Sequence, residues 1–96
     1  MKKGYVDILT NKNNSVLYVG VTSDIVKRIY EHKNKFVDGF SRRYNLEKLV
    51  YFELYQNIED AIIREKQLKK WNRAWKNRII NGMNPKWDDL YNEISS

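Results

Sequence analysis

The fold is decided by residues 4–21, which read GYVDILTNKNNSVLYVGV. Gly4–Leu9 and Val16–Val21 are rich in the branched and aromatic residues that favour strands. The residues between them, TNKNNS at 10–15, are typical of a turn, because asparagine tolerates left-handed backbone. This stretch therefore predicts an antiparallel hairpin.

Helical and strand patterns alternate after the hairpin. Potential N-cap residues precede a helix that we predict over residues 24–34. Residues 34–45 have no clear period and predict a basic loop with room for one helical turn. Lys48–Tyr55 is dense in aromatic and branched residues, which predicts a third strand in the centre of its sheet.

Two more helices are predicted in the second half of the chain. The first covers Ile58–Trp71, with acidic residues in its first turn and lysines near its end, as the helix dipole prefers. The second covers Arg73–Asn81 and is expected to end at Gly82 and Pro85.

Composition predicts one small domain over residues 1–96. The chain has 42% hydrophobic and 31% charged residues, as is typical of one globular domain. Its acidic tail is expected to pack back onto the domain through Trp87 and Tyr91. Because it contains no cysteine, disulfide scaffolds, cysteine-type zinc sites and thiol nucleophiles are excluded. No segment reads as a signal peptide or membrane span, so we expect a cytoplasmic protein with no membrane partner.

The charge favours a polyanionic partner, nucleic acid before a membrane surface. Eighteen basic and twelve acidic residues give a net charge of +6. Seven basic residues lie between Arg64 and Arg78, interleaved with Trp71 and Trp75. This pattern predicts either a phosphate-binding face or a solvated helix with its tryptophans in the core, and core packing is favoured over base stacking. The candidate nucleic-acid contacts are Lys27, Arg42, Arg43, Lys66, Lys69, Lys70, Arg73 and Lys76.

Polar residues interrupt the apolar stripe of the first helix. Arg28 and His32 share a helical face with Ile25 and Ile29. Either side chain alone has an ordinary explanation, because arginine can reach solvent from such a face and histidine can be satisfied in a core. Two on one face favour a functional site.

Glu65 lies in the apolar stripe of the Ile58–Trp71 helix, between Ala61 and Leu68. A buried carboxylate must be paired, protonated or bound to a cation. Lys69, four residues later, is the one nearby basic residue in the right helical direction. An ion pair and a metal site remain equal alternatives at this point.

The order of these elements and four short motifs resemble the GIY-YIG nuclease family. The motifs are Gly4-Tyr5-Val6-Asp7, Tyr18-Val19-Gly20, Arg28 with His32, and Arg64-Glu65-Lys66-Gln67-Leu68-Lys69. The resemblance runs from about residue 4 to 87 and is closest to the small stand-alone bacterial members, similar to the N-terminal domain of the excision-repair nuclease. It implies an α+β fold, a small three-stranded antiparallel sheet flanked by helices in the order β-β-α-β-α-α.

The resemblance also implies a metal-dependent endonuclease that hydrolyses DNA phosphodiester bonds, with structure-selective, repair-related activity. Glu65 would hold a single Mg²⁺ or Mn²⁺ ion, and Arg28 would stabilise charge on the phosphate. His32 would touch the phosphate or relay a proton, and Tyr18 would orient or deprotonate water. Gly20 would let the backbone pass close to the site.

One position departs from the family pattern. Asp7 stands where a tyrosine is expected, and Tyr5 lies two positions away along the strand. Asp7 could be the water-activating base, a second metal ligand, or the cause of a weakened enzyme. A further family asparagine corresponds to Asn81 or Asn84, and the sequence does not distinguish them.

The expected partner is DNA, with branched, flapped and single-stranded forms all open, and the expected state is a monomer. One alternative is a catalytically weakened or inactive nucleic-acid-binding module of the same fold. Another is a protein-interaction domain in which the basic surface serves solubility. The nuclease and the binding module both predict nucleic-acid binding that weakens as salt rises, whereas the protein-interaction domain does not.

Overall fold

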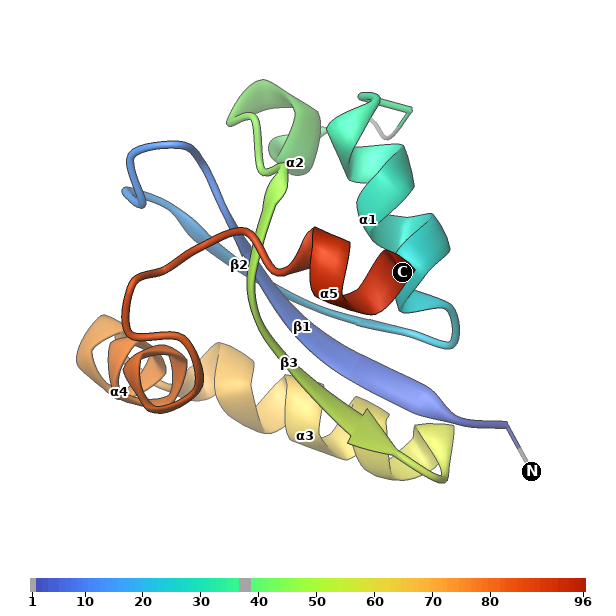
Figure 1. Cartoon of the computed structure of the whole chain (residues 1–96). Helices are drawn as coiled ribbons and strands as arrows, with labels where there is room; N and C mark the ends of the chain where they lie inside the picture. Colours follow the sequence, from blue (N-terminus) through green and yellow to red (C-terminus); the bar gives the residue numbers. More distant parts are fainter. Residues whose placement is uncertain (1, 37–38) are drawn as a thin grey trace.

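A computed structural model describes residues 2–36 and 39–96 and has one antiparallel sheet at its centre (Figure 1). Strands β1 (Gly4–Thr10), β2 (Leu17–Thr22) and β3 (Lys48–Tyr55) lie in the order β2-β1-β3. β1 pairs antiparallel with both neighbours. The predicted hairpin and the α+β class are confirmed, whereas the prediction that Lys48–Tyr55 is the central strand is wrong.

Burial explains why β1 takes the central position. Every residue of β1 except Tyr5 is buried, including Asp7 and Thr10. β3 pairs on one side only and leaves Leu54 47% exposed. The aromatic residues of β3 are typical of a central strand, which explains the wrong prediction. The polar residues Asp7 and Thr10 made β1 a less obvious candidate for the centre, although both are buried.

The turn between β1 and β2 depends on two asparagines. The Asn11 side-chain oxygen accepts hydrogen bonds from the backbone N–H groups of Ser15 (2.8 Å) and Val16 (3.1 Å). Asn14 has a φ of 60°, in the left-handed region that asparagine tolerates. The polar stretch thus closes the hairpin as its composition predicted.

Five helices occur in the described residues: α1 (Ile25–Lys33), α2 (Phe40–Arg43), α3 (Ile58–Lys70), α4 (Arg73–Met83) and α5 (Tyr91–Ser95). Side chains of Asp24, Asn57 and Asn72 accept backbone N–H groups at the starts of α1, α3 and α4. The loop at 34–45 contains α2 as its predicted helical turn, and residues 37 and 38 of that loop lie outside the described residues. α4 continues through Gly82 beyond its predicted end, and α5 was not predicted.

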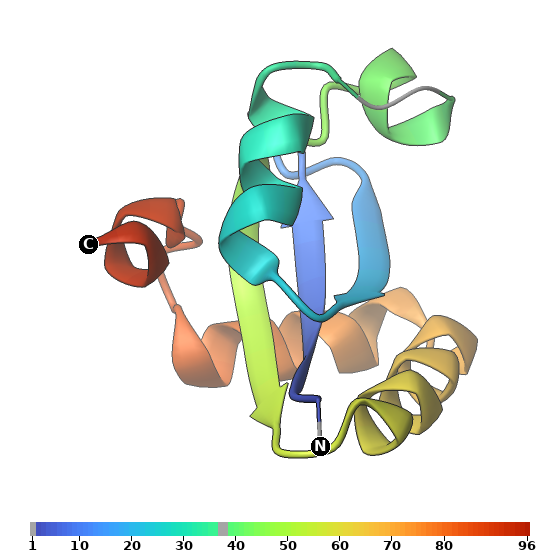
Figure 2. The ribbon, with the colours of Figure 1, turned by 90° about the vertical axis from the view of Figure 1, so that its right-hand side faces the viewer.

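Two hydrophobic clusters cover the two faces of the sheet. Val6 and Ile8 of β1 pack towards α3 and α4, whereas Leu9 packs with residues of α1 and the C-terminal segment. In Figure 1, α3 and α4 lie below the sheet and α1 above it, and in Figure 2, α1 lies in front of the strands while α4 passes behind them. Alternation along one buried strand therefore supplies both halves of the core.

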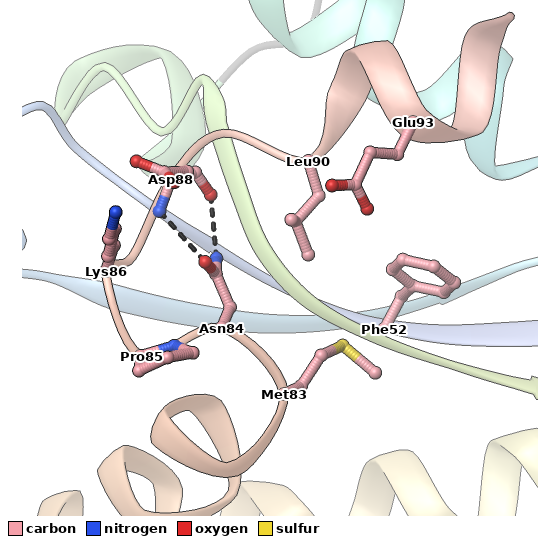
Figure 3. A pocket seen from close by; sticks show the side chains of 8 residues that line it. All are labelled: Phe52, Met83, Asn84, Pro85, Lys86, Asp88, Leu90 and Glu93. Atoms are coloured by element: carbon pink, nitrogen blue, oxygen red, sulfur yellow. Dashed lines mark hydrogen bonds between the residues drawn. The ribbon is translucent and has the colours of Figure 1, made fainter.

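The segment after α4 returns to the sheet. Leu90 is buried, and its N–H donates to the carbonyl of Leu49 in β3 (2.8 Å). Figure 3 shows Asn84 facing Asp88 above a pocket of about 380 Å³ that is lined in part by Phe52 and Met83.

The two aromatics of this segment confirm the prediction that it packs back onto the domain. Trp87 packs against one hydrophobic cluster and Tyr91 against the other, and both are partly buried. Among the described residues, no helix is long and apolar enough to cross a membrane.

Candidate active site

The centre of the candidate site is a contact between β1 and α1. Asp7 is fully buried, and its Oδ2 accepts a hydrogen bond from Arg28 Nε at 2.8 Å. Gly20 is the β2 residue that pairs with Asp7, and a Cβ built there would lie 1.9 Å from Arg28 Nη2. Since no other residue lacks a Cβ, Gly20 gives the guanidinium the room to lie against the sheet.

This ion pair leaves hydrogen-bonding capacity unused. Asp7 Oδ1 and Arg28 Nη2 are both buried and have no hydrogen-bond partner among the described residues. Burial raises the pKa of Asp7, Arg28 opposes that shift, and the charge of Glu65 adds to it. Orphaned buried donors and acceptors are uncommon in folded proteins, so this pair is a place where a ligand would gain contacts.

Tyr18 and His32 lie beside the guanidinium. The Arg28 Cζ is 5.9 Å from the centre of the Tyr18 ring, and the Tyr18 and His32 rings are 6.4 Å apart. Burial, with a smaller effect of the Arg28 charge, lowers the pKa of His32 to about 4. His32 is therefore neutral at pH 7, with one ring nitrogen able to donate and one able to accept.

Glu65 is buried in α3, in line with Ala61 and Leu68, as its position in the stripe predicted. Its Oε2 lies 2.7 Å from Lys69 Nζ. Of the two alternatives for this carboxylate, the structure contains the ion pair.

A cavity of about 250 Å³ lies between Tyr18 and Lys69, the partner of Glu65. Lys69 and Lys76 line it from the helices, and Tyr18 lines it from β2. Lys69 thus contacts Glu65 and shares a cavity with Tyr18, which in turn lies next to Arg28. The structure thus brings Asp7, Tyr18, Arg28 and His32 together, and Glu65 lies near enough for its charge to raise the pKa of Asp7.

The other predicted nucleic-acid contacts are distributed over several surfaces. Lys27, Arg42 and Arg43 are exposed on α1 and α2, and Lys66 and Lys70 are exposed on α3. Arg73 differs, because its guanidinium donates to the carbonyls of Asn14 and Ser15 in the hairpin turn. Arg73 therefore supports the turn, and each of its guanidinium nitrogens already donates to a group of the protein.

Both candidate asparagines have structural contacts. The Asn84 amide is buried and donates to the carbonyls of Val50 and Asp88. Asn81 is exposed and accepts a hydrogen bond from Trp87 Nε1 at 2.6 Å. Both residues thus hold the C-terminal segment in place.

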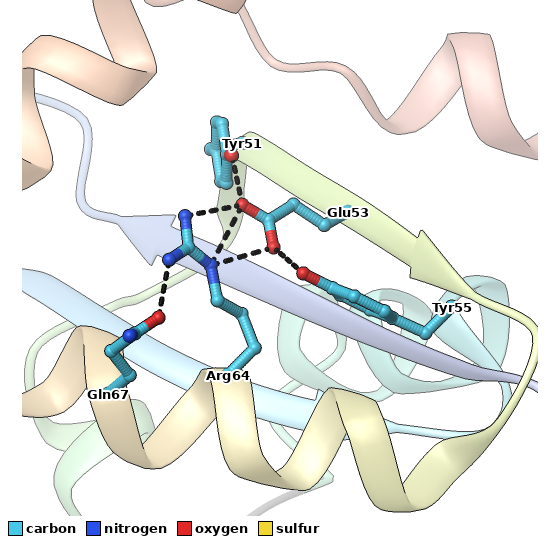
Figure 4. A network of polar contacts seen from close by, with 5 residues as sticks. All are labelled: Tyr51, Glu53, Tyr55, Arg64 and Gln67. Carbon is cyan, nitrogen blue, oxygen red and sulfur yellow. Dashed lines mark hydrogen bonds and ion pairs between the residues drawn. The ribbon is translucent and has the colours of Figure 1, made fainter.

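Sequence reasoning missed a second polar network, which joins β3 to α3 (Figure 4). Glu53 accepts hydrogen bonds from Arg64, Tyr51 and Tyr55. Burial alone would raise the pKa of Glu53, but these hydrogen bonds outweigh it and lower the pKa. The strand pattern Tyr51-Phe52-Glu53-Leu54-Tyr55 contained the signal, because its polar-tipped residues alternate and so share one face.

Comparisons with known proteins agree with this arrangement. The family model described as the GIY-YIG catalytic domain matches residues 3–79. A UPF0213 protein of Clostridium perfringens is 37% identical over 91 residues, which cover 95% of this chain and 97% of the relative. A UPF0213 protein of Syntrophus aciditrophicus is 36% identical over 81 residues, covering 83% and 92%.

A solved structure has the same fold. The solution NMR structure of a UPF0213 protein of Bacillus halodurans superposes with a TM-score of 0.57 and 25% identity, covering 92% of this chain and 93% of that one. Motifs, site geometry and relatives lead to the same conclusion: the chain belongs to the GIY-YIG family, among the small stand-alone UPF0213 proteins.

Proposed function

We propose that this protein is a divalent-metal-dependent endonuclease that hydrolyses DNA phosphodiester bonds. The observation that carries the proposal is the cluster of Tyr18, Arg28 and His32, in which Tyr18 lines a cavity together with Lys69, the partner of Glu65. A guanidinium, a phenol, a neutral imidazole and a buried carboxylate are the groups needed to bind a phosphate and manage its hydrolysis.

The residues present fit one hard divalent cation. The described residues contain no group of three or more His, Cys, Asp or Glu side chains that could hold a metal ion. Mg²⁺ nevertheless often binds through one carboxylate while keeping several waters, and Glu65 supplies such a carboxylate. When bound there, Mg²⁺ or Mn²⁺ would withdraw electrons from a phosphoryl oxygen. Lys69 would have to release Glu65, so metal and lysine compete.

Arg28 is proposed to neutralise the negative charge that develops on the scissile phosphate. Its Nε is held by Asp7, while Nη2 has no partner among the described residues and is able to donate to a phosphate oxygen. Asp7 thereby acts as a positioning residue for Arg28. Neither the role of water-activating base nor that of metal ligand draws support from a carboxylate with no exposed surface and an arginine partner.

Tyr18 and His32 are proposed to orient the attacking water and relay its proton. Because His32 is neutral at pH 7, it can accept a proton without first losing one. Tyr18 lines the cavity, and its ring centre lies 5.9 Å from Arg28 Cζ, so both side chains could contact one phosphate. The exposed cations on α1, α2 and α3 would hold the DNA backbone around this point without regard to sequence.

Cleavage of labelled DNA tests the proposal. Branched, flapped, single-stranded and duplex substrates are incubated with Mg²⁺, Mn²⁺ or EDTA, since structure-selective cleavage of the kind used in repair would favour branched or flapped forms. We expect metal-dependent products that disappear in Glu65→Ala and persist in Glu59→Ala, which removes an exposed carboxylate from the same helix. Products that survive Glu65→Ala would contradict the proposed site.

The alternative function, a nucleic-acid-binding module with weak or no cleavage, is favoured by the Asp7–Arg28 pair. A carboxylate on the guanidinium offsets part of the charge that would stabilise a phosphate. Asp7→Tyr separates the two functions, because activity that appears only in this variant would show a binding module. Metal titration of Asp7→Asn gives a further check, and we expect metal affinity to stay within about threefold, because Asp7 is occupied by Arg28.

A further inference from the structure

A second cavity lies on the outer side of α3 and α4 and is separate from the one that contains Tyr18. Its volume is about 510 Å³, and its lining residues are Ile63, Lys66, Gln67, Lys70, Trp71 and Trp75. Ile63 is 66% exposed and Trp75 is 49% exposed. We call it the tryptophan groove.

One wall of the tryptophan groove is fixed by the network in Figure 4. Glu53 holds the Arg64 guanidinium, which also donates to Gln67 at 2.6 Å and lies with its Cζ 5.0 Å from the centre of the Trp71 ring. Trp75 meets Trp71 edge-on, with ring centres 5.7 Å apart and planes at 89°. Since the Trp71 ring is anchored, Trp75 is presented to solvent in a defined orientation.

The groove also carries positive charge. Lys66 and Lys70 are exposed, and neither forms an ion pair within residues 2–36 and 39–96. Helical geometry turns them away from Glu65 by about 100° and 140°, so their charges belong to this groove rather than to the cavity that Tyr18 and Lys69 line. Two free ammonium groups beside an exposed indole suit a ligand that alternates anionic groups with flat aromatic ones.

We propose that the tryptophan groove binds a single-stranded segment of DNA, with an unpaired base stacked on Trp75 and flanking phosphates on Lys66 and Lys70. The inference rests on the proposed function for the identity of the substrate. Duplex DNA could use the lysines, but its bases are already stacked and offer no face to Trp75. An acidic peptide could likewise use the lysines but would leave the indole without a partner of matching chemistry.

The position of the tryptophan groove predicts which forms of DNA the protein prefers. A strand whose phosphate lies at Arg28 and Glu65 would reach the groove by passing around α3, and only an unpaired strand can bend and expose its bases there. The groove therefore selects flapped or branched DNA over plain duplex.

Binding of the full-length chain to a labelled thymidine oligonucleotide in EDTA tests this inference by fluorescence anisotropy. We expect Trp75→Ala to weaken binding by about tenfold and to leave unchanged the binding of an abasic strand of equal length. Phe36→Ala, which removes another exposed aromatic (69% exposed), is the matched control and should have no effect.

The double variant Lys66→Gln/Lys70→Gln should weaken binding of both strands and reduce the slope of log K against log salt by about 1.4, as expected for two phosphate contacts. Lys12→Gln/Lys86→Gln removes the same charge elsewhere and should reduce the slope less. Because Trp75→Ala could alter folding, Trp75→Phe is tested as well. In the unchanged protein, the oligonucleotide should quench the fluorescence of Trp75, and in Trp75→Phe most of this quenching should be lost.

Equal losses of thymidine and abasic binding in Trp75→Ala would overturn the inference, as would binding of a polyglutamate peptide that depends on Trp75. DNA cleavage that requires Glu65, together with single-strand affinity that ignores Trp75, would remove the inference and leave the proposed function intact. Trp75-dependent binding of single strands without cleavage would support the inference and remove the proposed function.

Discussion

At the scale of single residues, Gly20 controls the position of Arg28. A Cβ at Gly20 would lie 1.9 Å from Arg28 Nη2, so Gly20→Ala must push the guanidinium away from Asp7. We expect DNA cleavage to fall at least about tenfold while the fold is retained. Gly82→Ala is the control, because a Cβ there meets nothing within 4 Å and should leave cleavage unchanged. Full activity in Gly20→Ala would contradict the role given to Arg28.

His32 makes stability depend on pH. Its pKa is about 4 in the folded protein and about 6.5 when unfolded, so the unfolded chain binds more protons between these values. Stability is therefore complete above pH 6.5 and falls as the pH drops towards 4, by about 1–2 kcal/mol after solvent screening. Urea unfolding at a series of pH values measures this loss.

His32→Gln should flatten that profile between pH 6.5 and 4.5. The lowered pKa of Glu53 gives a loss in the same direction, but only below its ordinary value of 4.5. Asp7 acts in the opposite sense, because burial raises its pKa in the folded protein and so favours the protonated carboxyl there. Its contribution to stability is therefore lost as the pH rises through the raised pKa of the folded state. An unchanged slope in His32→Gln would show that other groups cause the pH dependence.

At the scale of elements, the Glu53 network joins β3 to α3. Glu53→Gln keeps the shape of the side chain but leaves Arg64 and two phenols without a charged acceptor. We expect the free energy of unfolding to fall by about 1–3 kcal/mol, because the Glu53 and Arg64 side chains are largely buried. Glu47→Gln, which breaks the exposed pair with Lys35, should cost less than about 0.5 kcal/mol.

Element boundaries were predictable wherever side-chain chemistry alone decides them. α1 and α3 begin after Asp24 and Asn57, which accept backbone N–H groups as their types predict. The end of α4 was not predictable in this way, because Gly82 lacks a positive φ and continues the helix. The helix therefore ends two residues later than predicted, at Met83. The sheet order was also missed, since a local pattern does not reveal that both faces of β1 are covered.

The candidate site was predictable only where a residue departs from the pattern of its own helix. Arg28, His32 and Glu65 stand out because they interrupt apolar stripes, and this signal is local. The partner of Arg28 is a contact across 21 positions of sequence, and only the fold could reveal that Asp7 accepts its hydrogen bond. Glu53 was missed because the alternation of Tyr51, Glu53 and Tyr55 shows only that they share a face, whereas the partner Arg64 lies on another element.

At the scale of the whole molecule, the net charge of +6 predicts how DNA binding responds to salt. If about four exposed cations contact phosphates, a fourfold increase in salt should weaken duplex binding by roughly a hundredfold. Anisotropy titrations over a salt series measure this slope. Absence of binding even at low salt would exclude both the nuclease and the binding module and favour a protein-interaction domain.

The returning C-terminal segment has one further consequence for the whole molecule. β3 is an edge strand, and such an edge offers unpaired backbone groups to any strand of another chain. The Leu90 N–H and the Asn84 amide donate to the carbonyls of Leu49 and Val50, so these two groups near the start of β3 are already bonded. The segment thereby protects the protein against edge-to-edge aggregation, and its colloidal stability therefore depends on the seven residues of irregular backbone between α4 and α5.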